Sequence, residues 1–306
     1  MIYDNNISKT EFLYKKKDVS VFIKREDLLH EHVSGNKFRK LKYNLFEAQK
    51  LNKTLLLTFG GAYSNHITAT AFAGKLFGMK TVGIIRGEEL GVDLEKTLET
   101  NPSLTLASEQ GMEFYFISRT EYRDKTNPKF IDELKQKFGD FYLVPEGGTN
   151  KLAVKGCEEI LNDEDEKFDY ICCGVGTGGT ISGIINSAKN HQKVLGFPAL
   201  KGSFLQKEIN KYVSDKENWE LINDYHFGGF AKINSDLVSF INKTKEDYNL
   251  VLDPIYTSKM LFGIDDLIKK NYFKKGTRIL AIHTGGLQGI EAMNIQLKKK
   301  GLQQID

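Results

Sequence analysis

The segment FDYICCGVGTGGTISGIINSAKN (168–190) contains an apolar stretch, a glycine loop and the start of a helical pattern, in that order. The stretch FDYICCGV (168–175) lacks the strict alternation of a half-exposed strand, which is typical of a strand buried on both faces of a parallel sheet. The glycines allow a close turn after it, and ISGIINSAKN (181–190) continues as a helix. The segment therefore predicts a strand–loop–helix unit of an α/β protein.

The rest of the chain repeats this arrangement. Predicted strands lie at 18–26, 54–61, 80–87, 112–118, 193–200 and 277–286, and the helical stretches between them include 64–77, 128–138 and 258–271. Because 306 residues with two series of strands suffice for two units, we expect two doubly wound, mostly parallel open-sheet domains with a ligand cleft between them. From composition, the polar segment LNDEDEKFD (161–169) is the expected boundary.

The overall composition excludes several kinds of partner. A net charge of +3, with both signs interspersed, gives no strong attraction to nucleic acid or to a membrane surface. No apolar run approaches the roughly 18 residues of a membrane span, and MIYDNNISKTEF (1–12) lacks the order of a signal peptide. The three cysteines, Cys157, Cys172 and Cys173, fit a reducing compartment, and the adjacent pair lacks the spacing of metal ligands. We expect a cytoplasmic protein without a metal site.

The loop GVGTGGTISG (174–183) has the features of an anion site at a strand end. Its glycines let the backbone approach an anion, and the following helix offers unpaired N–H groups and the positive end of its dipole. Gly174, Gly176 and Gly179 also satisfy the dinucleotide pattern, but that pattern needs an acidic residue about 20 positions later. The next predicted strand ends without one, and the first acid is Glu208. A single phosphate is therefore favoured over a dinucleotide or a structural turn.

The turn GGAYSNHITATA (60–71) follows another predicted strand and begins a helix. Ser64 and Asn65 are common N-cap residues, and the same position binds carboxylates because side chains and free N–H groups converge there. The residues leave a helix cap and an anion site equally open. His66 beside them either titrates or packs.

Two further turns place polar side chains at the ends of elements. In LDPIYTSKMLFG (252–263), Tyr256 precedes a predicted helix, where a phenol either packs or transfers protons. In IHTGGLQG (282–289), Thr284 follows a predicted strand. Its hydroxyl either belongs to a glycine turn or faces the ligand cleft.

Three lysines lie close together in VSGNKFRKLKYNLFEAQK (33–50), at Lys37, Lys40 and Lys42. The triplet Ser34-Gly35-Asn36 is a turn and cap signal, so Lys37 falls in the first turn of the predicted helix. The helix dipole opposes a cation there and lowers the pKa of its amine, and a neutral amine is the form that condenses with an aldehyde. The effect is small, so these residues alone favour a solvated helix face.

Eight short motifs occur together and in order. They are KREDL (24–28), SGNKFRKL (34–41), GGAYSNH (60–66), PEGGTN (145–150), GVGTGGT (174–180), FGGFAK (227–232), DPIYTSK (253–259) and HTGG (283–286). With them the chain resembles the pyridoxal-phosphate enzymes grouped as 1-aminocyclopropane-1-carboxylate deaminase and D-cysteine desulfhydrase, which are similar in fold to the tryptophan synthase β-subunit. The resemblance extends from residue 24 to residue 289, nearly the whole chain.

The resemblance implies pyridoxal 5′-phosphate as the cofactor and a small amino acid as the substrate. It implies that Lys37 carries the cofactor and later moves the α-proton, and that Lys40 reaches the phosphate. The phosphate cradle would consist of Gly176, Thr177, Gly178, Gly179 and Thr180, and the grip on the substrate carboxylate of Ser64, Asn65 and His66. The further implied roles are a contact to the cofactor ring oxygen for Asn65, catalytic proton transfer for Ser64, a catalytic position on the substrate side for Tyr256 and a cofactor contact for Thr284.

Two positions bear on the reaction that the resemblance implies. Members that open the cyclopropane ring typically have Tyr-Glu where this chain has Tyr256-Thr257, and leucine where it has Thr284. A glutamate near the pyridine nitrogen would hold it protonated, whereas a threonine hydroxyl leaves it largely neutral, which suffices for a good leaving group. We therefore expect α,β-elimination from an amino acid such as D-cysteine, with 1-aminocyclopropane-1-carboxylate deamination as the alternative. Tyr63 stands where a glutamine is typical, which leaves another β-substituted or D-amino acid open.

The resemblance also implies a domain division and an assembly. It predicts a larger cofactor-binding domain from 1–41 plus 153–306, and a smaller mobile domain from 42–152 that closes over the substrate. Relatives are commonly homodimers. Two alternatives of other classes stay open: a dinucleotide-binding oxidoreductase, from the glycine pattern alone, and a non-catalytic relative that binds cofactor or amino acid as a sensor.

Overall fold

The computed structural model describes residues 8–30, 33, 35–213 and 216–306. In this part of the chain the strands form two separate sheets. The larger sheet has the order β1 (Thr10–Lys16), β2 (Val19–Lys24), β10 (Arg278–Ile282), β7 (Tyr170–Val175), β8 (Lys193–Pro198) and β9 (Trp219–Leu221). The smaller sheet has the order β5 (Met112–Ile117), β4 (Lys80–Arg86), β3 (Leu55–Gly61) and β6 (Tyr142–Val144). Neighbouring strands are parallel, except for β1 and β2.

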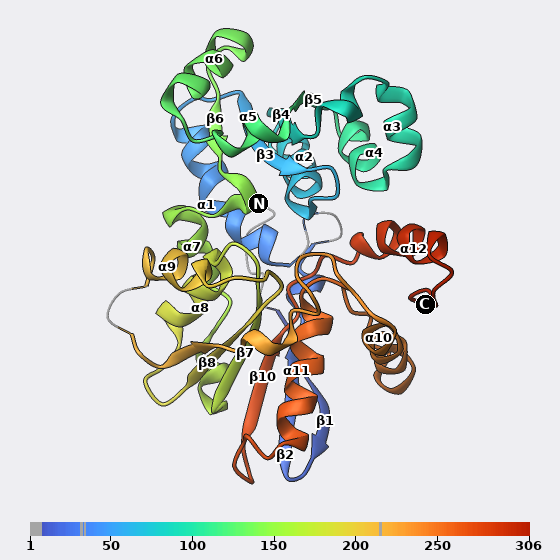
Figure 1. Ribbon diagram of the computed structural model, residues 1–306. Helices are drawn as coiled ribbons and strands as arrows, with labels where there is room; N and C mark the ends of the chain where they lie inside the picture. The colour runs from blue at the N-terminus through green and yellow to red at the C-terminus, as the bar shows by residue number, and fades with distance from the viewer. Residues whose placement is uncertain (1–7, 31–32, 34, 214–215) are drawn as a thin grey trace.

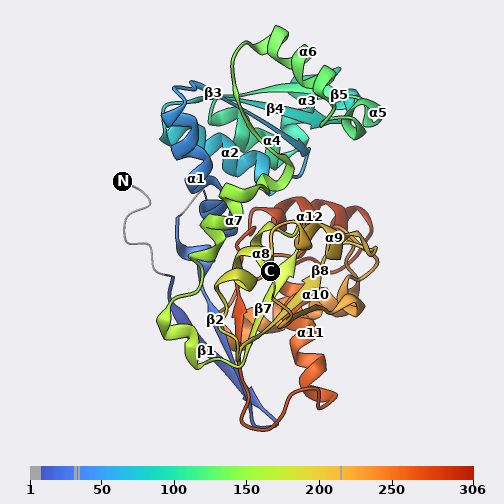
Figure 2. The same cartoon turned by 90° about the vertical axis from the view of Figure 1, so that its left-hand side faces the viewer.

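Each sheet is the centre of one lobe, and the two lobes are stacked (Figures 1 and 2). The helices of the smaller lobe are α2 (Asn65–Leu76), α3 (Leu94–Thr100), α4 (Pro102–Glu109), α5 (Arg119–Arg123) and α6 (Pro128–Phe138). Those of the larger lobe are α8 (Gly179–Ser187), α9 (Phe204–Asn210), α10 (Ser235–Tyr248), α11 (Thr257–Lys269) and α12 (Gly289–Lys299). Helices α1 (Asn36–Lys50) and α7 (Lys151–Glu158) pack against each other where the lobes meet.

Both faces of the larger sheet are buried. Ile279 and Ala281 of β10 pack into one apolar cluster, whereas Leu280 and Ile282 pack into a second cluster. Successive side chains of a strand point to opposite faces, so the central strand has helices on either side. This confirms the predicted fold class of two mostly parallel α/β sheets with helices around them.

Every strand predicted from the sequence is present, with small shifts at its ends. The strands that were not predicted are β1, β6 and β9. Strand β1 (TEFLYKK) is a largely exposed edge strand, and β6 and β9 have only three residues each. Such segments are too polar or too short to give a periodic apolar signal.

Helix α1 connects the two lobes. Phe38, Leu41 and Leu45 pack into the apolar cluster that contains Leu56 of β3. The first turn of α1 instead contacts the loop after β10, because the backbone N–H of Asn36 donates to the Thr284 carbonyl at 3.2 Å. The predicted division of the chain at 41/42 and 152/153 stays a prediction.

The acidic segment 161–169, the domain boundary that composition predicts, lies directly before β7 of the larger sheet. It forms a short 3-10 helix (Asp163–Lys167) against the larger sheet. The carboxylate of Asp165 pairs with the Nζ of Lys24 at 2.5 Å, and both side chains are almost completely buried. The amide of Gln192 also donates to the backbone carbonyls of Asp165 and Phe168. A polar composition therefore marks a buried ion pair here.

Across residues 8–30, 33, 35–213 and 216–306, no helix has the length and apolar character needed to cross a membrane. Apart from β1, the strands of each sheet point the same way, so their carboxyl ends meet at one edge. Residues at the ends of β3, β4, β7 and β10 then reach a common space between the lobes.

Candidate active site

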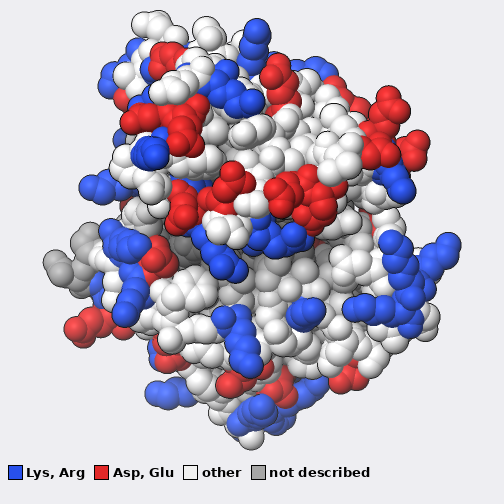
Figure 3. Space-filling model, turned by 45° about the horizontal axis from the view of Figure 1, so that its top comes forward, with Lys and Arg blue, Asp and Glu red and all other residues white. Residues whose placement is uncertain are grey.

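A cavity of about 530 Å³ lies between the lobes, lined by turns that follow β3, β4, β7 and β10 and by the first residues of α1. Figure 3 shows the hollow, with basic and acidic side chains gathered along its edges. The predicted site residues that line the cavity are Lys37, Lys40, Ser64, Asn65, His66, Gly176, Thr177, Gly178, Thr180, Tyr256 and Thr284. Gly179, the first residue of α8, stands behind this wall. The chain thus gathers, in one place, side chains that lie far apart in the sequence.

The start of α1 directs Lys37 into the cavity. Gly35 caps the helix with φ +63°, and a Cβ there would lie 1.9 Å from the Thr284 carbonyl oxygen, so only glycine fits. The cap has no side-chain hydrogen bond, and the predicted cap residue Ser34 lies outside the described residues. Close backbone contact with the Thr284 loop therefore sets the position of the first turn.

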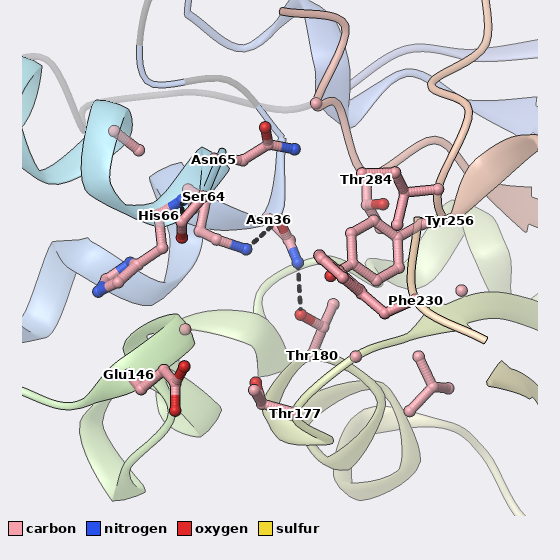
Figure 4. A pocket seen from close by; sticks show the side chains of 18 of the residues that line it. Asn36, Ser64, Asn65, His66, Glu146, Thr177, Thr180, Phe230, Tyr256 and Thr284 are labelled. Atoms are coloured by element: carbon pink, nitrogen blue, oxygen red, sulfur yellow. Dashed lines mark hydrogen bonds between the residues drawn. The ribbon is translucent and has the colours of Figure 1, made fainter. Parts of the chain in front are cut away.

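The amine of Lys37 has an unusual environment. Burial, and after it the charge of Lys40, lowers the pKa of Lys37 to about 7. Its Nζ lies 3.3 Å from Oδ1 of Asn36, whose Nδ2 donates to Oγ1 of Thr180 at 2.8 Å (Figure 4). A large fraction of this lysine is thus a neutral amine at neutral pH, which is the nucleophilic form.

Lys40 is a buried cation among neutral acceptors. Its Nζ donates to the Gly147 carbonyl and to Oγ1 of Thr149, both at 3.0 Å, and to Oγ1 of Thr177 at 3.4 Å. In the part of the chain that the structure describes, no carboxylate forms an ion pair with it, and burial lowers its pKa. A buried ammonium without a counter-charge is suited to bind an anion beside the glycine loop.

The glycine loop turns tightly into α8. Gly178 has the left-handed conformation, with φ +88°. A Cβ on Gly179 would lie 2.8 Å from the Thr149 side chain, and a Cβ on Gly176 would lie 3.1 Å from the hydroxyl of Tyr256. Glycine is therefore needed for packing as well as for anion approach. The first N–H groups of α8 have no acceptor within the helix, so they can serve an anion.

In the turn before α2, Ser64 acts as the helix cap, whereas Asn65 has the features of a ligand-binding residue. Ser64 is the N-cap of α2, and its Oγ accepts from the His66 N–H at 3.3 Å, so the cap is present. The amide of Asn65 reaches toward the loop after β10, where a Cβ on Gly286 would lie 2.7 Å from its Nδ2. Its Oδ1 is buried and has no partner in the structure. This orphaned amide points to a ligand rather than to packing alone.

His66 is a neutral imidazole that is fixed by Thr58. Thr58 donates its only hydroxyl hydrogen to the Val144 carbonyl at 2.8 Å, so it must accept from Nε2–H of His66, also at 2.8 Å. Burial, with Lys37 and Lys40 as further causes, holds the pKa of His66 well below its usual value. The ring points away from Asn65 (Figure 4), so His66 offers no positive charge to a carboxylate.

Tyr256 lies on the opposite wall, at the start of α11. The buried carboxylate of Asp253 accepts from the backbone N–H groups of Ile255, Tyr256 and Thr257 at 2.7–2.9 Å and fixes this turn. Burial, together with the charges of Asp253 and Glu146, raises the pKa of the Tyr256 phenol. It is a proton donor at neutral pH, and not a base.

Thr257 and Thr284 differ in their access to the cavity. Thr284 lines it, whereas Thr257 is completely buried in the first turn of α11 and its hydroxyl has no hydrogen-bond partner. The sequence alone could not distinguish these two threonines, because it does not show which of them faces the ligand cavity.

No role was predicted from the sequence for several residues that line the cavity. Arg86 ends β4, and the rule that ligands lie beyond strand ends could have found it. Phe204 and Phe230 are about half exposed and line the large-lobe side of the cavity. Phe230 is held in place by Lys259, whose Nζ donates to the carbonyls of His226 and Gly229 at 2.9 Å. Such loop contacts have no periodic signal.

Comparisons with known proteins give a consistent result. The profile of a family described as "Pyridoxal-phosphate dependent enzyme" matches residues 2–285. A Thermotoga maritima protein, provisionally named 1-aminocyclopropane-1-carboxylate deaminase, is 32% identical over 93% of this chain and 94% of its own length. The mitochondrial bifunctional D-cysteine desulfhydrase/1-aminocyclopropane-1-carboxylate deaminase of Arabidopsis thaliana is 31% identical over 88% of this chain and 73% of its own length. The crystal structure of an ACC deaminase homologue matches with a TM-score of 0.82 at 26% identity, covering 96% of this chain and 93% of that chain.

Proposed function

The chain belongs to the family of pyridoxal-phosphate dependent enzymes, and from this premise we propose that it catalyses α,β-elimination from a small amino acid such as D-cysteine, giving pyruvate, ammonia and sulfide. Its cofactor is pyridoxal phosphate, and the dinucleotide alternative is set aside. The second candidate is deamination of 1-aminocyclopropane-1-carboxylate to 2-oxobutanoate and ammonia, because the Arabidopsis relative carries both names.

The cavity fits this cofactor. The observation that carries the proposal is the pair of lysines in one cavity wall: the pKa of Lys37 is lowered to about 7, and Lys40 is buried without an ion pair to a carboxylate among the described residues. In this proposal the amine of Lys37 would hold the cofactor at its aldehyde group. Lys40, Thr177, Thr180 and the first N–H groups of α8 would hold the phosphate, and the orphaned amide of Asn65 would face the ring oxygen. When bound, pyridoxal phosphate withdraws electrons from the α-carbon of the amino acid.

The substrate side is assigned to α2 and to the turn before α11. The free N–H groups at the start of α2, with the side chains of Ser64 and Asn65, hold the α-carboxylate. His66 contributes through its backbone, since its imidazole is neutral and occupied by Thr58. Lys37 then takes the α-proton, Ser64 assists the proton transfer, and the phenol of Tyr256 donates a proton to the departing sulfur. Closure of the smaller domain would exclude water.

We choose elimination over ring opening because of the side of the cavity that Thr284 lines. Among the described residues that line the cavity, the one carboxylate is that of Glu146, which lies on the side away from Thr284 (Figure 4). Glu146 also accepts from the Tyr122 hydroxyl at 2.7 Å and pairs with Lys125 at 3.2 Å. On the Thr284 side, none of the described residues that line the cavity has a carboxylate that would hold a pyridine nitrogen protonated, and a weaker electron sink suffices when thiolate is the leaving group.

A product assay tests the proposal. Purified holoprotein should release sulfide and pyruvate from D-cysteine and little 2-oxobutanoate from 1-aminocyclopropane-1-carboxylate. The variant Thr284→Glu, which places a carboxylate on the cavity wall, should shift the ratio of the two rates toward ring opening. If 2-oxobutanoate is the main product, the second candidate replaces the first. A yellow protein that releases no keto acid from a panel of D- and L-amino acids would be a sensor and not an enzyme.

A further inference from the structure

Arg86 is a cation in the cavity wall that the proposed elimination does not use. It is the last residue of β4 and pairs in the sheet with Gly61, the last residue of β3. A Cβ on Gly61 would lie 3.6 Å from Nη2 of Arg86, so the guanidinium lies beside the turn that leads to Ser64. Its Cζ lies 5.6 Å from the centroid of the Tyr122 ring, a contact that orients the side chain.

In residues 8–30, 33, 35–213 and 216–306, no carboxylate forms an ion pair with Arg86. The nearby acidic residues are engaged elsewhere: Glu146 pairs with Lys125, and Glu89 pairs with Arg119. The charge of Glu146 is therefore offset by its own partner, whereas the charge of Arg86 is not. An unpaired guanidinium that faces a ligand cavity is a typical recognition group for a carboxylate, because it can donate two parallel hydrogen bonds.

The other positive groups of the cavity already have roles in the proposed function. The phosphate is assigned to Lys40 and the start of α8, and the α-carboxylate to the start of α2. We propose that Arg86 binds an anion at the end of the substrate side chain, so that the enzyme prefers thioether amino acids with a distal carboxylate over D-cysteine. This inference rests on the proposed elimination and names the substrate class of that site. S-carboxymethyl-D-cysteine is the simplest compound of the class.

The reaction of this class is balanced without an oxidant. The α-proton is removed, and the Cβ–S bond breaks with its electron pair going to sulfur. The sulfur leaves as mercaptoacetate after taking up a proton. The remaining three-carbon fragment is released as 2-aminoacrylate, which reacts with one water to give pyruvate and ammonia. Carbon and nitrogen keep their overall oxidation level, and the distal carboxylate leaves unchanged.

A matched pair of substrates tests the role of Arg86. S-carboxymethyl-D-cysteine and S-carbamoylmethyl-D-cysteine differ only in a carboxylate against a neutral amide. The wild-type holoprotein should have the higher kcat/KM for the acid. In Arg86→Gln the preference for the acid should fall about tenfold to a hundredfold, the range of a charge-assisted hydrogen bond, with the change mainly in KM. Arg86→Lys should keep part of the preference. Arg123→Gln, at an exposed arginine of α5 (Arg119–Arg123) with no ion pair in the described part of the chain, should leave it unchanged.

A binding measurement gives a second readout that needs no turnover. Adipate reproduces the spacing of the two carboxylates and has no amine, and its monoamide is the neutral control. Calorimetry should show tighter binding of adipate than of the monoamide to the wild type, and the difference should vanish in Arg86→Gln. The inference is overturned if Arg86→Gln weakens acid and amide equally, since Arg86 would then bind the α-carboxylate, or if neither changes. If no pyruvate forms from D-cysteine or either thioether, the proposed elimination fails, while the adipate titration still decides the role of Arg86.

Discussion

At Lys37, two effects lower the pKa of the amine to about 7: burial first, and the positive charge of Lys40 second. The dipole of α1 acts in the same direction, because Lys37 is the second residue of the helix. A dipole alone is worth only about 0.3–1 kcal/mol at an exposed site, so it cannot produce a shift of this size. The first-turn position of Lys37, which the sequence predicts and the structure confirms, is therefore a minor cause of the lowered pKa.

The pH dependence of Lys37 is the first prediction at this scale. The rate at which the apoprotein takes up pyridoxal should follow the neutral amine, rising with pH up to about 7 and levelling off above it. Pyridoxal lacks the phosphate, so Lys40→Met can be compared directly. Removal of that charge should move the midpoint to higher pH, because one cause of the lowered pKa is gone. A wild-type midpoint near 10.5, the ordinary value for lysine, would contradict this description of the amine.

At the scale of elements, the start of α1 depends on a single glycine. Gly35 has φ +63°, and its missing side chain lets the helix approach the Thr284 carbonyl. Gly78, after α2, has a nearly equal φ of +65° but no atom within 4 Å of its Cβ position. A side chain at Gly78 would therefore cost backbone strain alone, whereas a side chain at Gly35 would cost both strain and a steric clash.

Alanine substitutions measure that difference. Gly78→Ala should lower the free energy of unfolding by about 1–2 kcal/mol, the cost of the left-handed conformation. Gly35→Ala should lower it by about 3–5 kcal/mol, because overpacking is added to the strain, and should also weaken cofactor uptake. Urea unfolding of the apoprotein checks both values. Equal losses in the two variants would mean that the contact between α1 and the Thr284 loop is loose.

The segment 161–169 provides a second prediction for an element. Asp165→Asn leaves the ammonium of Lys24 buried without its partner, so the free energy of unfolding should fall by about 3–5 kcal/mol. Glu166→Gln breaks an exposed pair with Lys189 in the same segment and should cost less than about 1 kcal/mol. Thermal and urea unfolding would test this. A small effect of Asp165→Asn would show that the segment is only loosely attached to the larger sheet.

For the molecule as a whole, the sequence predicts the arrangement of strands and helices better than it predicts which residues line the cavity. The long apolar strands have signals of their own, whereas β6 and β9 exist only through pairing with a neighbour. The glycine loop and the turn at Ser64 are recognisable because backbone conformation restricts residue choice there. Arg86 and Phe204 line the cavity through tertiary packing, which no local pattern encodes, and the motif that contains Phe230 does not show that its ring lines the cavity. The predicted homodimer, cytoplasmic location and domain division stay predictions.

The roles assigned to the site residues all require that the cavity between the lobes holds pyridoxal phosphate on Lys37. Borohydride reduction of the holoprotein, followed by proteolysis and fragment sequencing by mass spectrometry, tests this most directly. The expected result is one phosphopyridoxyl group on Lys37, with Lys40 and Lys42 of the same helix unmodified. The result would contradict this assignment if Lys40 or Lys42 carried the label, or if complete reduction of the yellow holoprotein left no label on the chain.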